Sequence, residues 1–434
     1  MQRYGGLAVW VAVPVMILLA AYLAIYVGLF SMLVRVAAAR WGVAGVWLAP
    51  LFWVATEWAR SWVGGGFPWV LLGTSQATVL PVVQVASVVG VYGLSALIVL
   101  VSSAAAVVTL TRAPVHRRWA AGVAALLVLV AAGGVVRVTG GGLLRSGTVL
   151  RVGLVQGSID QAQKWDPRFR DAILDRYIDL SRQVIADGAG LVIWPEAATP
   201  FYFDAESSRA EPVRRLAAQA RTPFVIGSDE LTPGAGGQPG AIYNAAVLVG
   251  ADGRSRGSYR KMTLVPFGEY VPLRRLLFFV SPLVEAVGDF SAGTDAVVFD
   301  ADGRRISVAI CYESVYPGIA SQFVAGGSQL LATITNDAWF DRSSAAYQHF
   351  EQGIVRGVEQ GRYVVRAANT GISGAVDPYG RVLARTALFE PTALTVDVRL
   401  LDHRTIYSRT GDLVVWLGLA VGVWTAVPRR WRRG

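Results

Sequence analysis

The sequence predicts an α/β layered domain inserted between an N-terminal bundle of transmembrane helices and one C-terminal transmembrane helix. The 434 residues are 53% hydrophobic and only 16% charged, with a mean hydropathy of +0.45, which is too apolar for an ordinary soluble enzyme. The apolar excess is concentrated in residues 7–136 and 413–428. Residues 150–400 instead show short β-rich runs that alternate with helical stretches.

Four apolar segments precede the water-facing domain and are predicted to span a membrane: 7–34, 41–56, 90–111 and 119–136. Residues 79–89 either extend the third span or lie along the membrane interface. A fifth span, 413–428, follows the domain. We therefore expect a transmembrane bundle at 1–140, an extracytoplasmic domain at 141–405, and a C-terminal helix with a basic tail at 406–434.

Arginines beside these segments predict the orientation of the chain in the membrane. They also explain much of the net charge of +10, which in a nucleic-acid-binding protein would instead be clustered in one patch. By the positive-inside rule, three clusters face the cytoplasm: Arg35 with Arg40, Arg112 with Arg117 and Arg118, and the cluster Arg429, Arg430, Arg432 and Arg433. The domain then lies outside, and so does Met1. Residues 1–6 do not resemble a signal peptide, so the sequence favours a chain that lacks an odd number of upstream helices.

Residues 57–78 are expected to form an external loop that carries three tryptophans beside Glu57 and Arg60. Two interpretations remain open. The tryptophans form a general aromatic belt at the headgroup level, or the loop is a surface through which lipid enters.

Within the domain, strands are predicted at 149–156, 191–194, 223–227, 245–249, 306–310, 330–334 and 363–367. Helices are predicted at 167–186, 213–221 and 348–362, the first of them capped by Asp166 with Pro167 at its first position. Asp252-Gly253 and Asp302-Gly303 provide hairpin turns, and Tyr379-Gly380 resembles them. Strand–helix alternation combined with hairpins indicates a mixed sheet.

Two scarce residue types indicate candidate catalytic residues. Cys311 is the only cysteine, which excludes an internal disulfide and a thiol metal cluster and leaves an inert core residue or a nucleophile. Among 40 basic residues only Lys164 and Lys261 are lysines, so lysine is expected where a compact ammonium is needed. Glu196 follows an apolar run that ends at Pro195.

Glu196, Lys261 and Cys311 each lie at or near the end of a strand-like run, where sheet proteins gather side chains into one site. Glu196 is expected to act as the base for the thiol if partial burial raises its pKa, and Lys261 to stabilise negative charge on a carbonyl oxygen. This trio needs no histidine, and His116 is expected on the cytoplasmic side. The absence of G-x-S-x-G and H-E-x-x-H argues against a serine hydrolase and a zinc site, so we expect no metal and no cofactor.

The three residues resemble the Glu-Lys-Cys triad of the nitrilase superfamily. Together with the membrane segments, further motifs resemble its membrane branch, the bacterial apolipoprotein N-acyltransferases: 66–69 (GFPW), 155–157 with Lys164 and Trp165, 266–272 (PFGEYVP), 335–340 (TNDAWF), 348–349 (QH) and 366–371 (RAANTG). The family usually has eight spans, seven of them before the catalytic domain, so the resemblance implies that about three helices are missing.

The resemblance implies a nitrilase-like αββα sandwich and a two-step acyl transfer. Cys311 would take an acyl chain from a membrane phospholipid as a thioester and pass it to the N-terminal amine of a diacylglyceryl-cysteine lipoprotein. It also implies a monomer in the bacterial inner membrane, with the domain on the periplasmic side and no nucleic-acid partner.

Supporting roles follow from the same match, each with a structural alternative. Glu269 would orient Lys261 or assist proton transfer, or would form a surface ion pair. Glu313 would lie on the same side of an extended chain as the thiol and act in the reaction, or would make a structural hydrogen bond. Tyr312 would line the oxyanion or acyl pocket or simply pack, and Trp165 would handle substrate or be an ordinary exposed side chain. Asn336 and Asp337 are expected to brace the cysteine loop, and His349 to hydrogen-bond in the core without a chemical role.

Two other function classes remain as rivals. An amidase that hydrolyses a small amide is disfavoured because such a substrate needs no membrane helices. A transporter is disfavoured because the predicted spans contain almost no ionisable residues.

Overall fold

The computed structural model describes residues 8–233, 239–266, 268–270 and 290–427. The chain divides into two compact units, Met1–Gly141 with Thr405–Gly434, and Gly142–Arg404. The first unit is helical and the second contains two β-sheets.

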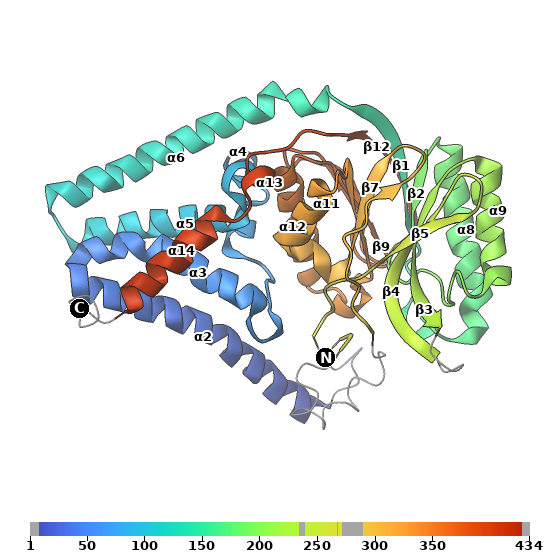
Figure 1. Ribbon diagram of the computed structural model, residues 1–434, viewed down its shortest axis with the longest axis horizontal. Coiled ribbons are helices and arrows are strands. Elements are labelled where there is room, and N and C mark those ends of the chain that lie inside the picture. Colours follow the sequence, from blue (N-terminus) through green and yellow to red (C-terminus); the bar gives the residue numbers. More distant parts are fainter. Residues whose placement is uncertain (1–7, 234–238, 267, 271–289, 428–434) are drawn as a thin grey trace. The chain divides into compact units, whose positions relative to one another are not determined.

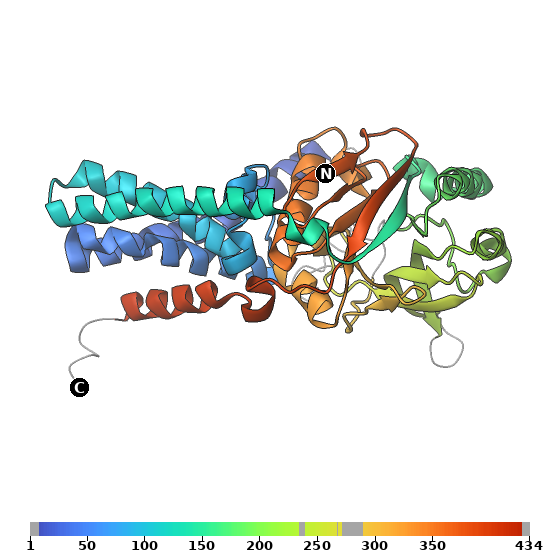
Figure 2. The ribbon, with the colours of Figure 1, turned by 90° about the horizontal axis from the view of Figure 1, so that it is seen from above.

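In its described residues the helical unit has four helices of fourteen or more residues before the sheet unit: α2 (Val9–Trp41), α3 (Ala49–Trp62), α5 (Ala86–Leu110) and α6 (Pro114–Gly140). The unit also contains α14 (Leu413–Ala426), the short helices α4 (Leu80–Val83) and α13 (Tyr407–Thr410), and the 3₁₀ turns Gly42–Leu48, Val63–Gly65 and Leu72–Gln76. Helices α2, α5 and α6 run along the same axis in the view of Figure 2, whereas Figure 1 shows that α2 and α6 diverge from one end of the unit. Helix α14 packs against α3 and α2.

Three segments in the described part of the chain are long and apolar enough to cross a membrane: Val9–Gly65, Ala86–Leu110 and Pro114–Leu144. The first of these segments contains two helices, α2 and α3. Helix α2 ends at Trp41 because the next residue, Gly42, adopts φ 60°, which does not continue an α-helix. Helix α14 has only 14 residues, or about 21 Å at the α-helical rise, which is shorter than the hydrocarbon core of a bilayer.

Two boundaries in this unit differ from those predicted. Residues 57–62 continue helix α3 instead of forming a loop, since the first chain-breaking residues are the glycines at 64–66. Glu57 is therefore buried, and its Oε1 accepts a hydrogen bond from the Leu72 N–H at 2.7 Å. Helix α6 begins at Pro114, so Arg117 and Arg118 lie in its first turns and not in the connection before it.

The described residues of the second unit form two six-stranded sheets. The first has the order β12–β1–β2–β3–β4–β5, built from β1 (Thr148–Gln156), β2 (Leu191–Ile193), β3 (Phe224–Pro233), β4 (Pro239–Val249), β5 (Ser255–Arg260) and β12 (Thr392–Leu400). The second has the order β11–β10–β9–β8–β7–β6, built from β6 (Phe299–Asp300), β7 (Arg305–Ile310), β8 (Leu330–Thr335), β9 (Val364–Ala368), β10 (Gly374–Val376) and β11 (Val382–Arg385). Strands β1–β3 are parallel, as are β7–β9, and the outer pairs are antiparallel.

Helices cover the outer face of each sheet (Figure 1). Helices α8 (Arg170–Ala186) and α9 (Ser207–Ala220) lie on the first sheet, and α11 (Pro317–Ala325) and α12 (Ala345–Gln360) lie on the second. The layers therefore run helix, sheet, sheet, helix, which confirms the αββα sandwich.

Local sequence signals explain several of these elements. The Asp166 carboxylate accepts from the Arg168 N–H at 3.0 Å and caps a 3₁₀ turn (Pro167–Phe169) that leads into α8. In the core beneath α8, Tyr177 stacks on Trp194 with ring centroids 4.9 Å apart. The Trp194 indole donates to Ser181 Oγ at 2.8 Å, so the polar atom of this buried ring is satisfied.

Candidate active site

Cys311 lies at a tight turn between β7 and a 3₁₀ helix (Cys311–Val315). Its φ is +52°, a left-handed conformation that is uncommon and strained for a residue with a Cβ. The side chain is half-buried. The fold thus presents the only thiol at a sharp change of chain direction.

Glu313 holds this turn in place. The carboxylate is fully buried and accepts from the N–H of Ile310 (2.8 Å), the N–H of Met262 (2.7 Å) and the hydroxyl of Tyr259 (2.8 Å). Burial raises the pKa of this carboxyl to about 7. The expectation of an extended chain at 311–313 is wrong, because the backbone curls into a helical turn so that Glu313 reaches these donors. Its contacts join the end of β7 to the segment just after β5.

Glu196 lies three residues after β2 and is buried. Its Oε1 accepts from Asn244 Nδ2 at 2.7 Å and lies 3.5 Å from Lys261 Nζ. Its Oε2 accepts from the N–H of Asn336, the residue that follows β8, at 2.8 Å. One carboxylate thus contacts residues from both sheets.

Lys261 follows β5 directly and is 1% exposed. Its Nζ lies 2.8 Å from Glu269 Oε1, and Asn244 Nδ2 donates to the same oxygen at 3.0 Å. Glu269 Oε2 accepts from the Val265 N–H at 2.8 Å. Glu269 is buried, so its pairing with Lys261 is not the surface ion pair considered above.

The three principal residues influence one another electrostatically. Burial and then the negative charge of Glu196 raise the pKa of the Cys311 thiol, and the Lys261 ammonium offsets this only in part. For Glu196, burial favours the protonated form, but Lys261 and the Asn244 amide outweigh it and bring the pKa below its usual value. For Lys261, burial is likewise outweighed by Glu269 and Glu196, so its pKa lies above its usual value. The resting cluster holds a neutral thiol, a carboxylate and an ammonium.

The expectation that burial raises the pKa of Glu196 is therefore wrong. The physical reason is that the carboxylate has several strong donors within the same buried space, and their attraction exceeds the desolvation cost.

A second buried cluster holds the main chain at Cys311. His349 Nε2 lies 3.1 Å from the Cys311 carbonyl oxygen, and its Nδ1 lies 3.0 Å from Asp337 Oδ1. Asp337 Oδ2 accepts from Arg366 Nη2 at 2.7 Å. Burial and then the charge of Arg366 lower the pKa of His349, so the imidazole is neutral. These contacts fit the bracing role expected for Asp337 and give His349 a direct link to the cysteine turn.

Trp165 and Tyr312, the two other predicted site residues, differ in their exposure to solvent. Trp165 is 49% exposed, and Tyr312 is buried with its ring edge-on to Tyr316 at 5.4 Å. Lys164, beside the exposed tryptophan, is 3% exposed and its Nζ donates to the Glu196 carbonyl oxygen at 3.2 Å. In the 266–272 motif, Phe267, Val271 and Pro272 lie outside the described residues.

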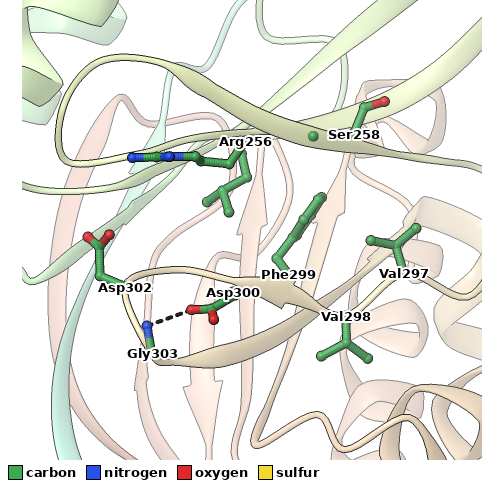
Figure 3. A pocket seen from close by; sticks show the side chains of 10 residues that line it. Arg256, Ser258, Val297, Val298, Phe299, Asp300, Asp302 and Gly303 are labelled. Atoms are coloured by element: carbon green, nitrogen blue, oxygen red, sulfur yellow. Dashed lines mark hydrogen bonds between the residues drawn. The ribbon is translucent and has the colours of Figure 1, made fainter.

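A cavity of about 550 Å³ lies elsewhere in the sheet unit, between β5 and the β6–β7 hairpin (Figure 3). Arg256, Ser258, Phe299 and Asp300 are among its lining residues, and the Asp300 carboxylate accepts from the Gly303 N–H at 2.5 Å. Glu196, Lys261 and Cys311 do not line it, so the cavity is separate from the candidate site.

Comparison with known proteins now decides the family. The carbon-nitrogen hydrolase family model matches residues 151–406, and the apolipoprotein N-acyltransferase N-terminal domain matches residues 1–104. An apolipoprotein N-acyltransferase of Geobacter metallireducens is 39% identical over 428 residues, covering 96% of this chain and 80% of the relative. Relatives with the same name from Methylococcus capsulatus and Shewanella oneidensis are 34% and 32% identical, covering 98% and 95% of this chain and 82% and 80% of their own length. The chain belongs to the apolipoprotein N-acyltransferase family.

Membership of the apolipoprotein N-acyltransferase family confirms the resemblance and identifies the chain as an acyltransferase of the membrane. Among solved structures, an amidase of the nitrilase superfamily from Nesterenkonia AN1 is 22% identical with a TM-score of 0.45, covering 61% of this chain and 95% of that chain. A likeness of this size supports no argument about chemistry.

Two residues of this buried cluster were missed by sequence analysis. Asn244 donates to both buried carboxylates, and Asp229 lies opposite it on β3. Neither has a sequence signal beyond being a polar residue in or beside an apolar strand. In the described part of the chain, no group of three or more His, Cys, Asp or Glu side chains could hold a metal ion.

Proposed function

We propose that the chain transfers an acyl chain from a membrane phospholipid, through a thioester on Cys311, to the N-terminal amine of diacylglyceryl-cysteine lipoproteins. The observation that carries this proposal is the buried cluster in which Lys261 Nζ lies 3.5 Å from Glu196 and 2.8 Å from Glu269, and in which both Glu196 and Lys261 act on the pKa of the Cys311 thiol. The family to which the chain belongs supports the lipoprotein acceptor.

In the first step, the Glu196 carboxylate takes the proton of the Cys311 thiol, and the sulfur attacks the ester carbonyl of the phospholipid. This proton transfer is unfavourable by itself, because the thiol has a higher pKa than the Glu196 carboxyl. Lys261 offsets the cost by attracting the negative charge that develops first on the sulfur and then on the carbonyl oxygen. Glu196 then gives the proton to the leaving oxygen. A lysophospholipid departs and a thioester remains.

In the second step, the amine of the lipoprotein attacks the thioester, and the sulfur leaves as a thiolate that is reprotonated through Glu196. Thiolate is a good leaving group toward an amine, so the thioester suits transfer. Lys261 keeps its charge throughout, because its pKa is held above the usual value by Glu269 and Glu196 against the effect of burial. Glu269 and Asn244 position it. Two substrates that react in turn on one thiol predict ping-pong kinetics.

This chemistry requires a site on the outer face of the inner membrane, where the lipoprotein amine is presented. We propose the domain boundaries 1–140, 141–405 and 406–434 with the middle domain periplasmic, supported by the arginine clusters and by the division into units at Gly141/Gly142 and Arg404/Thr405.

The test is accumulation of the acyl-enzyme. Incubated with phospholipid and no acceptor, the protein is expected to gain the mass of one acyl chain, and hydroxylamine should remove it. Because Cys311 is the only cysteine, a hydroxylamine-sensitive adduct reports on this residue alone. Cys311→Ala should abolish the adduct and Cys311→Ser nearly so, since a hydroxyl is far harder to ionise than a thiol.

A phospholipid whose chains are joined by ether bonds is the matched control, because it offers no carbonyl to attack. An undiminished adduct in Cys311→Ala would overturn the proposal. Free fatty acid as the only product, even with a lipopeptide acceptor present, would favour hydrolysis over transfer.

A further inference from the structure

The second step of the proposed reaction leaves one proton unassigned. Near neutral pH an α-amine with a pKa of about 8 is largely protonated. Conversion of an ammonium to an amide removes two protons, and regeneration of the Cys311 thiol consumes only one. The proposed function, on which this inference rests, therefore needs a second proton acceptor, either a side chain in the site or the solvent.

The two buried carboxylates already described are poorly placed for this task. Glu196 Oε1 accepts from Asn244 and faces Lys261, and its Oε2 accepts from the Asn336 N–H. Glu269 Oε1 accepts from Lys261 and Asn244, and its Oε2 accepts from a backbone N–H. Glu196 is already used for the proton of Cys311, and Glu269 is buried with a donor on each of its oxygens, so neither is left to take the surplus proton of the ammonium.

A third carboxylate, that of Asp229, faces the same cluster. Asp229 on β3 is the register partner of Asn244 on β4, and cross-strand partners project from the same face of a sheet. Asn244 contacts both Glu196 and Glu269. Asp229 is only partly buried, and among the described residues its carboxylate accepts no hydrogen bond. It is thus available to a ligand on the face where the reaction is proposed.

We propose that Asp229 binds the acceptor's α-ammonium and takes its first proton. The neutral amine then attacks the thioester, forming the C–N bond as the C–S bond breaks. Its second proton passes through Glu196 to the Cys311 sulfur, and Asp229 releases the first proton to bulk water. Every proton removed from the ammonium is then accounted for.

Charges around Asp229 suit this role. Burial raises the pKa of Asp229 to about 7, with Glu196 and Glu269 acting in the same direction and Lys164 and Lys261 opposing it. A base with a pKa near the working pH is well matched to proton transfer. Lys164 is buried with its Nζ at 3.2 Å from the Glu196 carbonyl oxygen, so we assign it as a positioning residue that keeps a positive charge near Asp229.

The experiment separates acylation from transfer. Acyl-enzyme is formed first, and its decay is followed after addition of either a diacylglyceryl-cysteine lipopeptide or hydroxylamine. Hydroxylamine is largely uncharged at pH 7, so its transfer releases no surplus proton. Asp229→Asn should form the thioester normally, lose about 100-fold in transfer to the lipopeptide, and keep its rate with hydroxylamine.

A pH series gives an independent readout. In Asp229→Asn, transfer to the lipopeptide should rise about tenfold per pH unit below the amine's own pKa, because the solvent must then supply the neutral amine. In the native chain the rise should level off near pH 7, once Asp229 is ionised.

Glu230→Gln is the matched control. Glu230 is the next residue on β3, so its side chain points to the opposite face, where it pairs with Arg260 at 2.5 Å. This variant should keep both transfer rates.

Undiminished transfer to the lipopeptide in Asp229→Asn would overturn the inference, and so would equal losses with both acceptors. A variant that forms no thioester would assign Asp229 to acylation, and the amine role would be withdrawn. Failure of the native chain to form a thioester would instead overturn the proposed function.

Discussion

At the scale of single residues, the fixed charge of Lys261 is the feature on which the proposed oxyanion stabilisation depends. An ammonium is a compact charge, and Glu196 and Glu269 hold it at 3.5 and 2.8 Å. A guanidinium spreads the same charge over a planar fork and needs more room than this buried site offers.

Lys261→Arg is therefore expected to lower the rate of thioester formation at least about 100-fold, the scale of losing one oxyanion donor. Single-turnover acylation measures this. The matched control is Arg260→Lys, the reverse exchange one residue earlier, where the side chain forms a partly exposed pair with Glu230. Comparable acylation by Lys261→Arg would show that only the net charge matters.

Sequence alone identified Glu196, Lys261 and Cys311 as a candidate set, because rare residue types at strand ends are visible without coordinates. It could not identify Asn244 or Asp229, since their importance comes from the register of β3 against β4, which brings two ordinary polar residues side by side. It also predicted the wrong direction for the pKa of Glu196. Burial can be anticipated from an apolar run, but the donors that outweigh it come from distant segments.

At the scale of secondary-structure elements, the turn that carries Glu196 depends on close approach to β3. A Cβ on Gly227 would overlap the Pro195 carbonyl oxygen, and the Ala198 N–H donates to the Gly227 carbonyl at 2.8 Å. The absence of a side chain at this one position lets the turn lie directly on the strand.

Gly227→Ala should therefore displace Glu196 and slow thioester formation at least about tenfold, because small misplacements of a catalytic group are costly. Thermal unfolding should show that the domain still folds. Gly318→Ala in α11 is the matched control, since a Cβ there meets nothing within 4 Å, and it should leave acylation unchanged. An equal effect of both changes would rule out the proposed contact.

The predicted elements are confirmed where the local signal is strong. The three hairpin turns, at Gly253, Gly303 and Gly380, each join an antiparallel pair. Helix α9 begins six residues before its predicted start and continues through Pro212. Strands β5, β6, β10, β11 and β12 and helix α11 were not predicted by range. Strand β11 is largely exposed and β10 has only three residues, so neither has a distinctive apolar pattern.

At the scale of the whole molecule, the arginine clusters make a prediction that does not depend on the family. A reporter that is active only outside the cytoplasm should be active when fused within 66–71 or at the Asp252-Gly253 turn. It should be silent when fused within 112–118 or after Arg433. An active fusion after Arg433 combined with a silent one at residue 253 would invert the proposed topology.

The sequence predicted the order of apolar segments and the central α/β domain more completely than it predicted where individual helices begin and end. Apolar segments and the central α/β region are properties of long stretches of sequence, so their existence is robust to local error. The prediction ended α3 too early and began α6 too late. Hydropathy marks only the apolar part of a helix and does not show that the helix continues into polar residues. The monomeric state stays a prediction.

On the proposed periplasmic side the lone thiol would face an oxidising compartment, where its neutral state protects the enzyme from inactivation. Peroxides attack thiolates, and burial together with Glu196 keeps the Cys311 sulfur protonated at rest. A sulfenic acid formed there would have no neighbouring cysteine in this sequence to resolve it as a disulfide, and further oxidation would be irreversible. In the proposed reaction the thiol ionises only when an ester is in place and is then masked as a thioester, which would limit the time for which the sulfur is vulnerable.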